Sequence, residues 1–112
     1  MNKLQAETMG EKMLTEAKGI IDDDKWIVVV WESCCGWGVY LSRSSLKIVC
    51  TERDNSYYYS CTLASRKNGE GCEIWQREGV SPTVREAFFA QKKAAQDSVE
   101  NLVNIYTEVF GE

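Results

Sequence analysis

Cysteine offers the widest range of chemistry in this sequence, and the chain has five cysteines but no histidine. Cys34 and Cys35 are adjacent, and no pair has the Cys-x-x-Cys spacing that is typical of zinc sites and dithiol redox centres. Without histidine, one chain cannot assemble a Ser-His-Asp or Cys-His catalytic group, because both need an imidazole base. The sequence therefore predicts a protein that is not an enzyme and that binds no metal or other cofactor.

Two further patterns could bind ions or phosphates. Asp22, Asp23 and Asp24 could hold a cation, but three consecutive acids cannot all face one site, and the glycine and distal glutamate of a calcium loop are missing. Gly36 and Gly38 form a lone G-x-G, which is a weak signal for a phosphate-binding loop. We therefore expect the three aspartates to form a solvated turn and the glycines to form a turn or bulge.

The N-terminal half predicts one helix followed by strands. Residues 1–19 show apolar side chains three or four positions apart, and Gly19 is expected to end this helix. Residues 25–31 are β-branched and aromatic at both parities, which predicts a strand covered on both faces. The remaining sheet is expected to be a meander of four to five antiparallel strands. After a turn at residues 33–38, its strands are residues 39–41, Leu46–Glu52, Tyr57–Ser65 and Cys72–Glu78. The last three strands are separated by turns at residues 53–56 and 67–70, and the second turn has the Asn-Gly hairpin signal.

The last element is a predicted helix that begins with Ser81 as N-cap and Pro82 as first helical residue. Its apolar spacing continues to the end of the chain, as one long helix or as two helices with a break near Gln96 that folds the end back. An unbroken helix would overhang the domain and expose an apolar strip, through which we expect two copies to form a homodimer. This strip contains Leu102, Tyr106 and Phe110. Residues 1–112 are thus predicted to form a single α+β domain with an N-terminal helix, a meander sheet and a long C-terminal helix.

The register of the strands predicts two different sheet faces. Pairing Cys50 with Tyr59, Ile48 with Cys61 and Leu63 with Ile74 places the apolar residues, Cys72 among them, on a core face. The opposite face combines aromatic, hydroxyl and basic side chains, and both helices can pack on the other side of the sheet. We take it as the candidate binding surface; the alternative is an ordinary half-exposed face or one covered by the first helix. Its candidate binding residues are Lys47, Tyr58, Trp75 and Arg77.

Charge and hydropathy limit the partners. Residues 25–93 carry ten basic against seven acidic residues, whereas both ends are acidic, so a small anionic ligand such as a nucleotide could bind the sheet. Trp75 or Tyr58 would stack on it, and Lys47 or Arg77 would pair with its phosphate. Duplex nucleic acid is not expected, because no strongly basic patch exists. No apolar run approaches a membrane span, which predicts a cytoplasmic protein without membrane contact.

The C-terminal half carries a resemblance to known families. From Tyr57 onward, a strand, a glycine turn and a further strand lead into Ser81-Pro-Thr-Val-Arg-Glu86-Ala87, which opens a helix. This order resembles HicB-type antitoxin domains and small bacteriophage accessory proteins of helix-sheet-helix sandwich type. The resemblance implies a protein that occupies a host protein stoichiometrically, such as a phage-encoded, anti-CRISPR-like inhibitor of a defence system. A sponge for a small anionic ligand and a HicB-like antitoxin are the alternatives.

Overall fold

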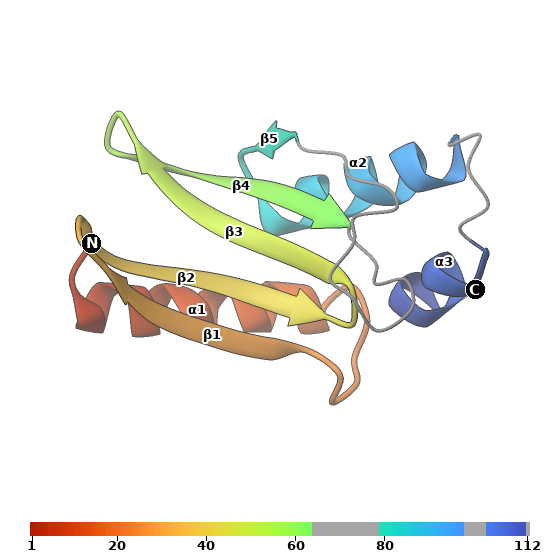
Figure 1. Cartoon of the computed structure of the whole chain (residues 1–112), viewed down its shortest axis with the longest axis horizontal. Coiled ribbons are helices and arrows are strands. Elements are labelled where there is room, and N and C mark those ends of the chain that lie inside the picture. Colours follow the sequence, from red (N-terminus) through yellow and green to blue (C-terminus); the bar gives the residue numbers. More distant parts are fainter. Residues whose placement is uncertain (64–78, 98–102, 112) are drawn as a thin grey trace.

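The computed structural model describes residues 1–63, 79–97 and 103–111. It confirms the α+β class, with an N-terminal helix and a five-stranded antiparallel meander in which the strand order follows the chain order (Figure 1). The predicted strand at 72–78 and the predicted turn at 67–70 lie outside the described residues. The elements are α1 (Lys3–Lys18), β1 (Ile27–Ser33), β2 (Gly36–Arg43), β3 (Leu46–Arg53), β4 (Ser56–Leu63), β5 (Val80–Ser81), α2 (Val84–Gln96) and α3 (Val103–Phe110).

Tight turns join the first four strands. Asp54 and Asn55 have φ values of 51° and 62°, the left-handed conformation that a two-residue hairpin turn requires and that Asp and Asn tolerate. The first hairpin turns at Cys34 and Cys35 alone, because Gly36, with a φ of 120°, already begins β2. The returning strand is therefore eight residues long, and the prediction of a long glycine turn before a three-residue strand was wrong.

Both long helices pack on one face of the sheet and bury the predicted core. The structure confirms the register, with Cys50 opposite Tyr59 and Ile48 opposite Cys61. In Figure 1, α1 lies behind β1 and β2, and α2 packs near β4. Helix and sheet residues form one cluster whose buried members include Ala6, Met9, Met13, Ala17, Leu41, Leu46, Ile48, Leu63, Val84 and Phe88. Cys72 and Ile74, which were also expected in this core, lie outside the described residues.

The composition of strand β1 predicted that both of its faces are covered, and this prediction was wrong. β1 is an edge strand, and the described helices lie on one side of the sheet only, so alternate side chains of β1 meet solvent. Val28 and Val30 pack against the core, whereas Ile27 is 58% exposed and Trp31 is 37% exposed. A run that is apolar at both parities therefore places an apolar row on the surface.

In the described residues the C-terminal segment forms two helices, α2 ending at Gln96 and α3 beginning at Val103. The single long overhanging helix was therefore a wrong prediction, and the structure agrees with the alternative of two helices with a break near Gln96. The N-cap of α2 is Thr83, whose hydroxyl accepts a hydrogen bond from the backbone N–H of Glu86 at 3.0 Å; Ser81 lies in β5 instead. α3 packs against the same domain, with the ring of Phe110 centred 5.3 Å from that of Phe88 and only 4% exposed.

The expected strip for dimerisation is therefore not an overhanging surface. Tyr106 is half-buried and its ring lies 5.0 Å from that of Phe110, while its hydroxyl oxygen accepts a hydrogen bond from Gln96 at 2.7 Å. Leu102 lies outside the described residues. Because Phe110 is buried within its own chain, the physical reason for pairing two copies through this helix is removed.

A buried arginine ties three distant segments together beneath one end of the sheet. Arg43, 2% exposed, donates two hydrogen bonds to the Asp23 carboxylate at 2.5 and 2.7 Å, and its Nε donates to the carbonyl oxygen of Val109 at 2.8 Å. The guanidinium also lies over the Trp26 ring at 5.3 Å. These hydrogen bonds lower the pKa of Asp23 from 3.8 to about 2. Asp23 thus anchors a core arginine, which corrects the expectation of a wholly solvated turn.

Candidate binding face

The face of the sheet opposite the helices, called the outer face from here on, is defined by the strand register. Successive strand residues alternate between faces, so one parity in each strand points away from the core. Nothing in the described part of the chain packs over these positions except their neighbours on the sheet. The outer face comprises Ile27, Val29, Trp31, Gly38, Tyr40, Ser42, Lys47, Val49, Thr51, Arg53, Tyr58, Ser60, Thr62 and Val80.

An aromatic row crosses the outer face from β1 to β3. The indole of Trp31 lies on the bare backbone of its cross-strand partner Gly38, where an added Cβ would come within 2.4 Å of the ring. Its centroid is 5.5 Å from that of Tyr40, and the ammonium of Lys47 lies 5.1 Å from the Tyr40 ring centre. A tilted ring–ring contact and cation–π attraction therefore hold the exposed Trp31, the half-buried Tyr40 and a base in a defined arrangement.

The charge of the outer face differs in sign from that of the whole chain. The chain carries a net charge of −4, whereas the outer-face strand positions that the structure describes hold the bases Lys47 and Arg53 and no acid. Both bases are exposed. The outer face is thus a locally basic, partly aromatic surface on an acidic protein, and it attracts acidic groups.

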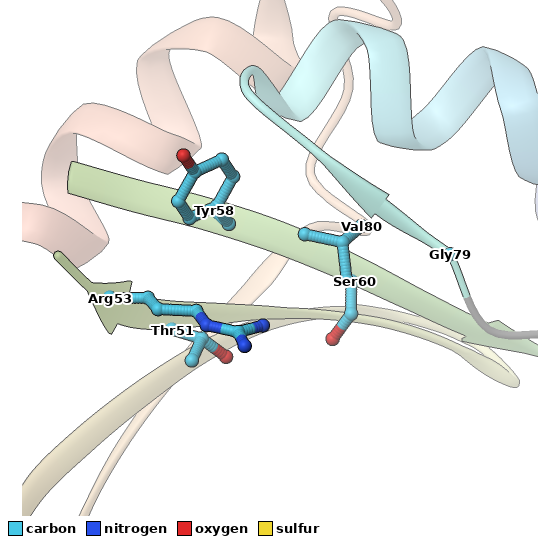
Figure 2. Close-up of a pocket in the computed structure, with 6 residues that line it drawn as sticks. All are labelled: Thr51, Arg53, Tyr58, Ser60, Gly79 and Val80. Atoms are coloured by element: carbon cyan, nitrogen blue, oxygen red, sulfur yellow. The ribbon is translucent and has the colours of Figure 1, made fainter.

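One end of the outer face is hollowed beside β5. The hollow has a volume of about 280 Å³ and is lined by Thr51, Arg53, Tyr58, Ser60, Gly79 and Val80. Figure 2 shows the Arg53 guanidinium pointing into it from β3, with Tyr58 on β4 and Val80 on β5 around it. Its lining thus offers a cation, hydroxyl groups and one aromatic ring, the groups that bind a phosphate or carboxylate next to a flat ring.

The predicted binding residues are not brought together as one site. Lys47 and Tyr58 both lie on the outer face, as expected. Tyr58 pairs with Thr51, four residues along β3 from Lys47, so the two lie about 13 Å apart along the strand direction. Lys47 belongs to the aromatic row, and Tyr58 lines the hollow. Trp75 and Arg77 lie outside the described residues.

The sequence reasoning missed three prominent side chains of this face. Trp31 was assigned to a strand buried on both sides, and Arg53 was assigned to a turn, although it is the last residue of β3. Tyr40 was placed in a short returning strand of residues 39–41. A usable signal was present, because Gly38 lies two residues before Tyr40 and leaves room for an aromatic ring on the neighbouring strand.

The described cysteines fall into two classes. Cys50 and Cys61 are buried, as predicted; burial raises the pKa of Cys61 to about 12, and burial, with a smaller effect of Glu52, raises that of Cys50 to about 11. Cys34 and Cys35 are exposed at the first hairpin turn, with their sulfur atoms 3.5 Å apart. Among the described residues, no three His, Cys, Asp or Glu side chains gather into a group that could hold a metal ion.

Neither the described helices nor comparison with known proteins points to a particular function. None of the described helices is long and apolar enough to cross a membrane. The resemblance to phage accessory proteins and HicB-type domains stays a prediction. The chain matches no protein family, no curated protein and no solved structure.

Proposed function

We propose that this chain is a non-catalytic binding protein that uses its outer face to occupy an acidic surface of a partner protein. The observation that supports this function is the aromatic row of Trp31, Tyr40 and Lys47 on the exposed side of the sheet. Tryptophan and tyrosine are among the residues that contribute most binding energy at protein interfaces. Their positions are set by the sheet and by Gly38, so little side-chain freedom is lost on binding.

The sign of the charge indicates the kind of surface that the partner offers. Lys47 and Arg53 face outward without an acidic neighbour among the described strand residues of the outer face, so an acidic partner surface gains attraction from both. An inhibitor that blocks a host protein, such as a phage-encoded anti-defence protein, needs a face of this kind.

The test is capture of a partner from a bacterial lysate, with two charge-matched variants. Lys47→Glu reverses a base on the outer face, and Lys12→Glu makes the same change in net charge on the exposed side of α1. We expect the wild type and Lys12→Glu to retain one partner in a one-to-one ratio and Lys47→Glu to bind it at least about tenfold more weakly.

Three results would contradict the proposal. Equal loss of capture in the two variants would show that only the overall charge matters. Retention by Lys47→Glu at wild-type strength would place the contact elsewhere on the molecule. Turnover of a substrate by the pure protein would contradict the non-catalytic role.

The hollow supports a second candidate function, capture of a small anionic ligand. Arg53 points into it and has Thr51, Ser60 and the ring of Tyr58 around it (Figure 2). A volume of about 280 Å³ is close to the lower end of small-molecule sites, which favours a ligand of the size of a nucleoside monophosphate. Trp75 and Arg77 stay predicted contributors to such a site.

Calorimetric titration with a panel of nucleoside monophosphates tests this function. We expect Arg53→Gln to abolish the binding heat, whereas Arg85→Gln, the same change at an exposed position on α2, leaves it unchanged. A flat titration of the wild type across the panel would exclude the binding of a nucleotide in the hollow and leave the binding of a partner protein as the proposed function.

A further inference from the structure

The outer edge of β1 is an unpaired strand edge. β1 pairs with β2 over seven residues, from Ile27 opposite Ser42 to Ser33 opposite Gly36, and no described strand lies on its other side. In such a strand every second residue points its N–H and C=O away from the sheet. The edge therefore presents a row of backbone donors and acceptors to a further strand.

Residues 27–31 of β1 carry none of the usual features that keep strand edges apart, and the charge of the strand lies beyond them at Glu32. The register of β1 with β2 runs without a bulge, and residues 27–31, Ile-Val-Val-Val-Trp, contain no proline and no charge. Ile27 is 58% exposed and Trp31 is 37% exposed, so apolar side chains border the open edge. The opposite edge of the sheet is different, because β5 has only the two residues Val80–Ser81.

We propose that β1 pairs antiparallel with β1 of a second copy, around a two-fold axis at Val29, so that the two sheets join into one. This interface goes beyond the proposed function, since it uses the strand edge and not the centre of the outer face. The occupant is a second copy because residues 27–31 are symmetric about Val29, with a large apolar residue at each end and valines between. A strand with this symmetry is complementary to itself, as a two-fold interface requires.

The side chains select this register. Residues that face each other in an antiparallel pair point to the same side, so the axis must pass through a residue and not between two. An axis at Val29 places Ile27 against the partner's Trp31 on the outer face and Val28 against the partner's Val30 on the helix side. An axis at Val30 would instead place Val28 against the partner's Glu32.

Mass measurement by light scattering under reducing conditions tests the interface. We expect the wild type to have twice the 12.7 kDa mass of one chain at micromolar concentration. Val29→Lys and Val29→Glu should each be monomeric, because like charges would meet at the axis, and an equimolar mixture of the two should recover the dimer. Val49→Lys, on the outer face of β3 away from the edge, is the matched control and should stay dimeric.

Ile27→Asp keeps the proposal testable if the changes at Val29 disturb folding, because Ile27 is 58% exposed and its replacement leaves the core intact. This variant should be folded by circular dichroism and monomeric. A wild type that stays monomeric, a dimer that survives both Ile27→Asp and Val29→Lys, or a mixture that fails to recover the dimer from folded variants would overturn the proposal. A monomer whose edge binds a β-strand of another protein would overturn it as well.

Discussion

Replacing Gly38 by alanine should change the arrangement of the side chains on the outer face with little change in the stability of the fold. The added Cβ would lie 2.4 Å from the nearest Trp31 ring carbon, well inside the contact distance of two carbon atoms. Trp31 is 37% exposed, so its indole can swing toward solvent. We therefore expect Gly38→Ala to displace the indole from Tyr40 and leave the sheet intact.

Two opposing free energies set the size of the effect on unfolding. Loss of the contact between Trp31 and Tyr40 costs about 0.5–1.5 kcal/mol beyond the buried area. Alanine in place of glycine within a strand returns about 0.5–1 kcal/mol, because the unfolded chain has less freedom to lose. The free energy of unfolding should therefore change by no more than about 1 kcal/mol, whereas overpacking a closed core costs about 1–3 kcal/mol.

Fluorine NMR of protein that contains fluorotryptophan measures the displacement directly. The chain has four tryptophans, and the signal that disappears in Trp31→Phe identifies Trp31. We expect this signal to shift in Gly38→Ala and the remaining signals to stay in place. Gly79→Ala is the matched control, because nothing lies within 4 Å of the Cβ that it adds. Partner capture should fall in Gly38→Ala only.

An unchanged Trp31 signal would refute the reasoning, because the added methyl group and the indole cannot share one position. A loss of about 3 kcal/mol or more in unfolding free energy would refute it in another way, since it would show that the indole has no free path toward solvent.

Three further predictions concern the fold that carries the outer face. Gly10→Ala should destabilise the protein in urea unfolding although alanine favours helices, because its Cβ would lie 2.6 Å from Cγ1 of the stiff Val28 side chain. Adding Val28→Ala in a double variant should remove this penalty. A single variant that is more stable than the wild type would contradict the clash. Thr83→Ala should lower the unfolding free energy by about 1 kcal/mol through loss of the N-cap, and an unchanged urea midpoint would argue against it. The hydrogen bonds from Arg43 hold the pKa of Asp23 at about 2, below its ordinary 3.8. The contribution of this ion pair to the free energy of unfolding is therefore complete above pH 3.8 and is lost as the pH falls toward 2. The wild type should lose more stability between pH 5 and pH 2 than Asp23→Asn, and parallel losses would count against the ion pair.

Local signals in the sequence were sufficient to predict the register of β3 with β4. The turn at Asp54 and Asn55 fixes which residues of β3 and β4 face each other, and alternation then assigns Cys50 and Tyr59 to the core. Lys47 and Tyr58 followed onto the outer face by the same count. Such counting works because a tight turn leaves no freedom in the pairing of the strands that it joins.

The errors arose where tertiary contacts decide between equivalent local patterns. β1 is apolar at both parities, so only the position of the helices shows that Trp31 is exposed. Serine is the better N-cap by residue type, but the pairing of Ser81 with Tyr59 in the sheet leaves the role to Thr83. Arg43 gave no signal at all, because nothing in a strand sequence distinguishes a buried arginine from a solvated one.

The hydrogen bond from Arg43 to Val109 also has a kinetic meaning, because it joins residues 66 positions apart. The hairpins close short loops, whereas this contact closes a long one, and the entropy lost in loop closure grows with loop length. We expect the sheet and α1 to assemble first and α3 to dock last, so that its detachment is the least costly partial unfolding of the native protein. Backbone amides of α3 should then exchange with deuterium before those of β2 and β3, and each opening would bring the guanidinium of Arg43 briefly to the solvent.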